Sequence, residues 1–298
     1  MAFYVICKSR LKIIPKFPLH SIRTAVKLSY KIFGESEVDP DDPPIFLFHD
    51  LLGTKKHWDS LGKTMVNMTK RSVVAVDLRN HGDSPHASSH KYEDMADDIL
   101  KLFKKLSVDK ASIVGHGMGG RASMCVSLID PEKVAGLLIV DISPVSTCNH
   151  LKEFTKVLAI IKEINFKEQK KICTAKRHVK KKLKSIIHDD TLMNNILSNI
   201  ILKSNGLIGW SCNLDVLIKD FKNISSFPKM KNKKYFGPSL FIGGQLSEYI
   251  PPDDLNGIRE MFPRAVISYI PQTGHSLHID DPKSFLEVAI AFLRTNEN

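Results

Sequence analysis

A sharp, glycine-rich turn carries the residues whose types and spacing point most clearly to chemistry. Residues 115–119 read Gly-His-Gly-Met-Gly, which matches the Gly-x-Ser-x-Gly turn that presents a serine nucleophile between a strand and a helix. The central residue here is Gly117, so the turn lacks the hydroxyl that would attack a carbonyl carbon. Glycine adopts the strained backbone of that position without steric cost. The sequence therefore predicts the geometry of a nucleophilic site without its nucleophile.

A histidine further along the chain is the predicted base of this site. His275 lies in the stretch Thr-Gly-His-Ser after the last predicted strand, which fits the chain order nucleophile, acid, histidine. A lone histidine is more often structural than catalytic. One in a Gly-His loop downstream of such a turn is typical of the base that accepts the nucleophile's proton and returns it to the leaving group.

Three acidic residues are candidates for the group that orients His275. Asp141 ends the strand predicted to lie beside the strand of the glycine turn, and Asp215 follows Asn-Leu at 213–214. Glu248 stands close to the place after the strand at 240–242 where such an acid is usual, although a role in a turn explains it better. The sequence favours Asp141 and Asp215 equally as the acid that orients His275.

Two backbone amides are the predicted oxyanion hole, those of Leu51 and Met118. Removing one donor from such a site costs about 2.7–4 kcal/mol of transition-state stabilisation. Asp50 directly precedes Leu51, and its carboxylate would repel a developing oxyanion if it pointed inward. Gly117 and Asp50 thus lie at one predicted site, and both oppose catalysis.

Alternating strands and helices are predicted to position these groups. Short apolar runs predict strands, and apolar residues at helical spacing predict the helices between them. The strands are expected at 26–33, 45–48, 73–76, 112–114, 136–140, 239–242 and 266–270, and the helices at 58–68, 92–106, 121–129, 254–261 and 282–293. This order predicts an α/β fold with a mostly parallel sheet, helices on both faces, and functional loops at the carboxyl ends of the strands.

Residues 145–235 interrupt the alternation and are predicted to form a helical lid. They contain no strand runs, and their apolar residues keep helical spacing. The core is then made of residues 26–144 and 236–298. A lid at the strand carboxyl ends normally covers the pocket and determines what enters it.

Composition narrows the class of protein. The 298 residues are 43% hydrophobic, as in globular proteins, and no apolar run approaches the roughly 18 residues of a membrane span. The five cysteines are scattered and form no Cys-x-x-Cys pair, which indicates reduced thiols in an intracellular protein rather than a disulfide framework or a zinc site.

The net charge of +11 is concentrated in a few segments. Residues 1–25 are basic and free of acidic side chains, which favours a mitochondrial presequence over a basic surface arm of a cytoplasmic protein. Lysines also cluster at 167–184 and 229–234 in the lid. Because no nucleic-acid-binding motif accompanies them, a solvated basic face is the favoured interpretation. A surface that contacts an anionic membrane or an acidic partner is a further hypothesis.

Five stretches carry a resemblance to a known family: Asp77-Leu-Arg-Asn-His-Gly-Asp-Ser-Pro-His86, Gly115-His-Gly-Met-Gly-Gly120, Asp141-Ile-Ser-Pro-Val145, Asn213-Leu-Asp215 and Gly274-His275. Through them the chain resembles, from about Val26 to Leu293, the α/β-hydrolase superfamily. Within it, the chain is similar to the alpha/beta-hydrolase domain-containing protein 11 group and its bacterial esterase relatives.

The resemblance implies an α/β-hydrolase fold and a serine ester hydrolase that acts on acyl or lipid esters without a cofactor. It also implies a mitochondrial location, since the animal members of the group are mitochondrial. The family's serine corresponds to Gly117, its base to His275, and its acid to Asp215 or Asp141. The glycine implies weak or no hydrolysis, because loss of a triad member costs about 10⁶ in kcat. The alternative is a catalytically inactive protein that binds a lipid or small molecule, or that regulates a partner.

Overall fold

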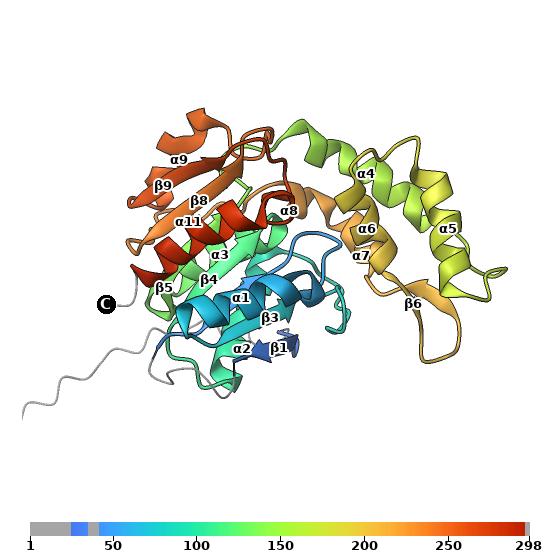
Figure 1. Cartoon of the computed structure of the whole chain (residues 1–298), viewed down its shortest axis with the longest axis horizontal. Coiled ribbons are helices and arrows are strands. Elements are labelled where there is room, and N and C mark those ends of the chain that lie inside the picture. The colour runs from blue at the N-terminus through green and yellow to red at the C-terminus, as the bar shows by residue number, and fades with distance from the viewer. Residues whose placement is uncertain (1–24, 35–41, 296–298) are drawn as a thin grey trace, which may run out of the picture.

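The computed structural model describes residues 25–34 and 42–295 (Figure 1). The predicted presequence, apart from its last residue, lies outside the described residues. Within the described ranges, no helix has the length and apolar character needed to cross a membrane.

A seven-stranded sheet in the order β1-β3-β2-β4-β5-β8-β9 forms the centre of the molecule (Figure 1). All neighbouring strands are parallel except β1, which pairs antiparallel with β3, so the predicted fold class is confirmed. The strands are β1 (Ser29–Phe33), β2 (Ile45–Phe48), β3 (Val73–Asp77), β4 (Ala111–His116), β5 (Val134–Val140), β8 (Ser239–Gly244) and β9 (Ala265–Ile270).

The first strand is shorter than the alternating pattern at 26–33 predicts. The Val26 amide donates to Asp98 Oδ1 at 2.6 Å, so this part of the chain is held by a helix side chain before it reaches the sheet. Ladder pairing with β3 begins at Ser29, opposite Asp77.

Helices cover both faces of the sheet. On one face lie α1 (Asp59–Thr69) and α11 (Pro282–Arg294), and on the other α2 (Tyr92–Lys105) and α3 (Met118–Ile129) (Figure 1). Successive strand residues point to opposite faces: within β2, Ile45 and Leu47 pack toward α1, while Phe46 and Phe48 pack toward α2. The remaining helical segments of the core are η1 (Lys55–Trp58), η2 (Pro131–Lys133), η3 (Pro252–Asp254), α9 (Leu255–Met261) and α10 (Leu277–Asp280).

The segment predicted to be a helical lid extends to one side of the core (Figure 1). It contains α4 (Asn149–Lys162), α5 (Ile172–Leu183), α6 (Asp190–Ser198), α7 (Leu214–Lys219) and α8 (Phe221–Ser225). The expectation that it holds no strands is wrong, because β6 (Ile200–Leu202) and β7 (Ile208–Trp210) form an antiparallel hairpin. Strands of three residues are too short to produce a periodic pattern.

Candidate active site

The glycine-rich turn joins β4 to α3 with the backbone that a nucleophile elbow requires. Gly117 has φ +49°, a left-handed conformation that favours glycine. The outer glycines are needed for close approach of backbones. A Cβ on Gly115 would lie 2.5 Å from the Gly119 carbonyl oxygen, and one on Gly119 would lie 2.6 Å from the Phe48 carbonyl oxygen. The elbow is therefore built as the sequence predicts, with nothing on its central residue.

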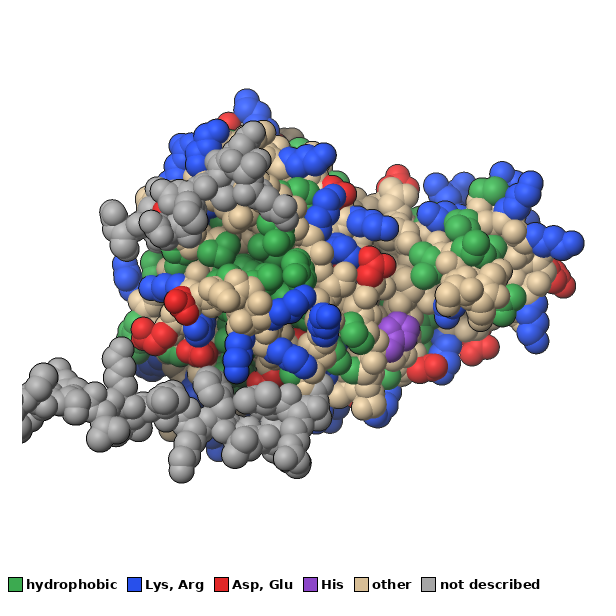
Figure 2. Space-filling view, turned by 90° about the horizontal axis from the view of Figure 1, so that it is seen from below, with side chains coloured by type: hydrophobic (Ala, Val, Ile, Leu, Met, Phe, Trp, Pro, Cys, Tyr) green, Lys and Arg blue, Asp and Glu red, His purple; other side chains and the backbone are tan. Residues whose placement is uncertain are grey.

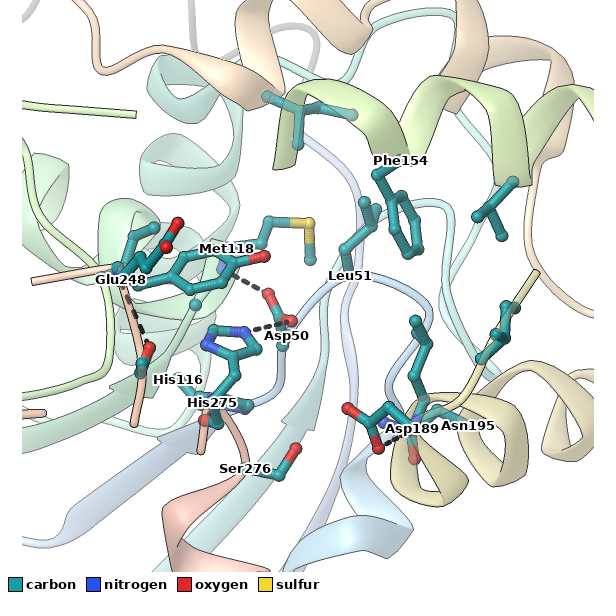
Figure 3. Close-up of a pocket in the computed structure, with 18 of the residues that line it drawn as sticks. Asp50, Leu51, His116, Met118, Phe154, Asp189, Asn195, Glu248, His275 and Ser276 are labelled. Atoms are coloured by element: carbon teal, nitrogen blue, oxygen red, sulfur yellow. Dashed lines mark hydrogen bonds and ion pairs between the residues drawn. The ribbon is translucent and has the colours of Figure 1, made fainter. Parts of the chain in front are cut away.

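The Asp50 carboxylate fills the place of the missing side chain. A Cβ built on Gly117 would lie 2.0 Å from Asp50 Oδ1 and 2.3 Å from its Cγ, far inside contact distance. The same oxygen accepts a hydrogen bond of 2.7 Å from the Met118 amide (Figure 3). Asp50 comes from the loop after β2, next to the elbow strand. A side chain from a neighbouring loop thus stands where the elbow residue would present its own.

His275 lies between two carboxylates. Its Nδ1 is 2.8 Å from Asp141 Oδ2. Its Nε2 is 3.1 Å from Asp50 Oδ2, a contact that Figure 3 shows. The Gly244 amide donates to Asp141 Oδ1 at 3.0 Å, and the Ser247 hydroxyl donates to Oδ2. The Tyr249 ring stacks on the imidazole with centroids 3.9 Å apart. The order aspartate, histidine, carboxylate parallels a catalytic triad in which Asp50 takes the third place.

The charges in this network make His275 a cation at neutral pH. Burial opposes the charged form, but the hydrogen bonds and charges of Asp141 and Asp50 outweigh it and raise the pKa of His275 to about 10. Burial likewise opposes ionisation of Asp50, yet the bond to His275 holds the pKa of this carboxyl well below its usual range. The pKa of His116 falls to about 4, because it is buried and lies beside the His275 cation.

The motif that begins at Asp77 holds the loop that carries Asp50. His49 Nε2 accepts from the Leu78 amide at 3.0 Å, and its Nδ1–H donates to the Asp50 carbonyl at 2.7 Å. In the same way, His81 Nε2 accepts from the Leu52 amide at 3.1 Å. Desolvation lowers the pKa of both histidines, so each stays neutral and keeps one acceptor nitrogen. This positioning role was not predicted from the sequence.

The other predicted site residues lie at different distances from His275 in the structure. Asp215 is not at the site: it lies in the first turn of α7, where its side chain is 78% exposed and pairs with Lys162 at 2.8 Å. Glu248 borders the cavity, and the residue that pairs with His275 Nδ1 is Asp141. Of the two predicted oxyanion donors, the Met118 amide is bonded to Asp50, and Leu51 lies on the cavity wall.

A cavity of about 600 Å³ opens from this network toward the lid. Asp50 and His275 border it with side chains 24% and 21% exposed. The opposite wall comes from lid helices α4 and α6 and the loop before α6. Apolar residues on the wall are Leu51, Phe154, Val157, Ile186, Leu192 and Leu246 (Leu51 and Phe154 are labelled in Figure 3). The site therefore presents the Asp50–His275 pair at one end and a mostly apolar wall that also carries polar lid side chains such as Asp189 and Asn195.

Asp50, His116 and His275 present metal-ligand atoms within 4.8 Å of one another. Hydrogen bonds account for this cluster as it stands. His275 uses both nitrogens on carboxylates, and His116 Nε2 is 2.9 Å from the His275 carbonyl oxygen. The close approach of these three side chains is therefore accounted for by hydrogen bonds, without a bound metal ion.

The sheet order, the elbow and the histidine after the last strand together define a hydrolase-type site, and comparison with known proteins agrees. Residues 43–163 match the family model described as alpha/beta hydrolase fold. The chain belongs to the alpha/beta-hydrolase family, among the relatives of the ABHD11 lipases and of bacterial-type esterases.

The curated relatives extend over nearly the whole chain. The "sn-1-specific diacylglycerol lipase ABHD11" of Danio rerio is 36% identical over 276 residues, which cover 92% of this chain and 85% of the relative. The Mus musculus protein of the same name is 36% identical over 89% of this chain and 85% of its own. A solved marine microorganism esterase superposes with a TM-score of 0.81 at 33% identity, covering 90% of this chain and all of that one.

Proposed function

We propose that this protein has lost serine-based ester hydrolysis and uses its lidded pocket to bind a neutral ester- or acyl-lipid-like molecule. The observation that carries the proposal is the Asp50 carboxylate in the place of the nucleophile. A serine mechanism needs a hydroxyl, a neutral base and free oxyanion donors. Here the hydroxyl is absent, His275 is a cation, and the Met118 amide is bonded to Asp50.

The cavity indicates the class of ligand. Its wall is mostly apolar, and the relatives carry the names of a diacylglycerol lipase and an esterase. The two carboxylates and the imidazolium of this network together leave one net negative charge where it borders the cavity. A free fatty-acid anion would be repelled there, whereas a neutral ester or acylglycerol would not.

Ester turnover and ligand binding test the two halves of this proposal. We expect no hydrolysis of a short-chain nitrophenyl ester by the wild-type protein, and measurable hydrolysis by the double variant Gly117→Ser/Asp50→Gly. A non-hydrolysable dialkylglycerol should raise the Tm, because a ligand at a hundred times its Kd stabilises the folded state by about 2.7 kcal/mol. Wild-type ester turnover, or a Tm that responds only to a fatty-acid anion, would contradict the proposal.

We also propose that the lid contacts an anionic membrane. Three apolar side chains of the β6–β7 hairpin are exposed, Ile201 by 37%, Leu202 by 58% and Leu207 by 65%. Hydrophobic and basic side chains lie side by side at the lid end of the molecule (Figure 2). Exposed apolar residues together with lysines suit an interfacial surface, since each lysine near an anionic bilayer contributes about 1 kcal/mol.

Co-sedimentation with vesicles that contain phosphatidylglycerol tests the membrane contact. We expect binding that weakens as salt is raised, and weaker binding by the double variant Leu202→Ser/Leu207→Ser, which keeps every charge. The core variant Val266→Ser, which alters another exposed apolar side chain (56%), is the matched control. Equal binding by all three proteins would exclude the hairpin as the contact.

A further inference from the structure

The group that stands in the place of the serine is itself a nucleophile. Asp50 points with His275 into the cavity, beside the Met118 amide (Figure 3). Its Oδ1 accepts from that amide at 2.7 Å, and its Oδ2 is 3.1 Å from His275 Nε2. We propose that Asp50 Oδ2 attacks an alkyl electrophile, an epoxide with an apolar substituent, and that the protein hydrolyses it through a covalent Asp50 ester. This activity goes beyond the binding role above and does not depend on it.

The chemistry of a carboxylate selects the electrophile. Attack on an ester carbonyl would form an anhydride, which is more reactive than the ester that produced it. Attack on a saturated, strained carbon forms an ordinary ester, as carboxylate nucleophiles do in other covalent mechanisms. The apolar wall that includes Phe154, Val157 and Leu192 then accommodates the substituent of the epoxide.

The first step uses both partners of Asp50. Oδ2 forms a bond to an epoxide carbon, the carbon–oxygen bond of the ring breaks, and its electron pair goes to the ring oxygen. That oxygen takes the Nε2 proton of His275, which lies beside Oδ2. The products are a hydroxyalkyl ester of Asp50 and a neutral imidazole still paired with Asp141.

The second step needs only water. Neutral His275 takes a proton from a water that enters from the cavity, and the hydroxide attacks Cγ of Asp50. The oxyanion that develops on Oδ1 is already bonded to the Met118 amide. When the intermediate collapses, the alcohol oxygen leaves, takes the proton of the new carboxylic acid, and departs as a diol. Asp50 and His275 return to their starting charges.

Mass spectrometry with styrene oxide as the probe tests the proposal. In a single turnover in water labelled with heavy oxygen, the wild-type protein should incorporate one heavy oxygen into Asp50, and the diol should carry none. The variant His275→Gln should form the diol far more slowly, because the first step lacks its acid and the second its base, and any hydroxyalkyl ester that does form at Asp50 should persist. Asp50→Asn should show neither label nor adduct. A Tm for each variant establishes that it is folded.

Asp215→Asn is the matched control, since it changes a carboxylate that the structure places in an exposed ion pair away from the cavity. It should behave as the wild-type protein. Heavy oxygen found in the diol and not in Asp50 would mean direct attack by water and would overturn the proposal. An adduct confined to a cysteine such as the exposed Cys173, or no diol from the wild-type protein, would overturn it as well.

Discussion

Placing serine at position 117 is the perturbation with the most direct structural consequence. In Gly117→Ser the new Cβ would lie 2.0 Å from Asp50 Oδ1, so the two side chains exclude each other. Asp50 would have to leave the Met118 amide and His275. The serine would also keep a left-handed backbone with φ +49°. We therefore expect this single substitution to destabilise the protein and to leave it inactive.

Two contributions set the magnitude of this destabilisation. A non-glycine residue in strained backbone costs about 1–3 kcal/mol. Loss of one hydrogen bond to a charged group costs roughly 1.5–3 kcal/mol, and one such bond is counted here because Asp50 retains some access to solvent. The sum, about 2.5–6 kcal/mol, corresponds to a fall in Tm between roughly 5 and 20 °C for a domain of this size.

Thermal unfolding followed by circular dichroism measures this difference. Gly206→Ser is the matched control, because Gly206 also has a positive φ (+77°) but no atom within 4 Å of an added Cβ. It reports the backbone strain alone. In the double variant Gly117→Ser/Asp50→Gly the overlap is gone, while the hydrogen bonds of Asp50 are lost with its side chain, so this variant separates the overlap from the loss of the bonds. If Gly117→Ser and Gly206→Ser lower the Tm equally, Asp50 does not occupy the place of the serine.

Three further predictions follow from the ion pairs. Because the pKa of His275 is raised to about 10, the charged imidazole stabilises the fold fully below pH 6.5 and loses this contribution as the pH rises toward about 10. The Tm difference between the wild-type protein and His275→Gln should therefore narrow between these two pH values. In Asp141→Asn the pKa of His275, followed by NMR, should fall, whereas Asp215→Asn should leave it unchanged. Arg79→Met breaks a buried pair with Asp98 at 2.6 Å and should lower the free energy of unfolding in urea by about 3–5 kcal/mol; a cost under about 1 kcal/mol would refute this.

The core of the fold was predictable because its signals are local. Strands such as Ile45–Phe48 and Val73–Asp77 are continuous apolar runs, typical of parallel strands buried on both faces. The hairpin in the lid was missed because its strands have three residues and lie among helical periods. The start of β1 was placed too early, since its alternation continues into residues that bond to a helix instead of a strand.

The site was predictable only where one segment carries the information. Gly117 and His275 lie in short sequence motifs, and these motifs identify the two positions without information on which residues meet in space. The choice between Asp141 and Asp215 depends on which loop reaches His275, 134 residues from Asp141 along the chain, and no local pattern encodes that contact. Asp50 was predicted to oppose an oxyanion. Its bond to His275, 225 residues away, follows from the meeting of loops at the sheet edge.

Gly117 and Asp50 are structurally coupled. With serine at position 117 the Asp50 carboxylate has no room, and with glycine at position 50 the Gly117 turn would leave the Met118 amide and His275 without their present partner. Each residue is therefore compatible with the fold because of the other. Gly117→Ser or Asp50→Gly alone should fail to support a serine mechanism, while the double variant Gly117→Ser/Asp50→Gly frees the amide, the base and the space together. Non-additivity of the two substitutions in a double-mutant cycle, in both Tm and ester turnover, is the quantity that measures this coupling.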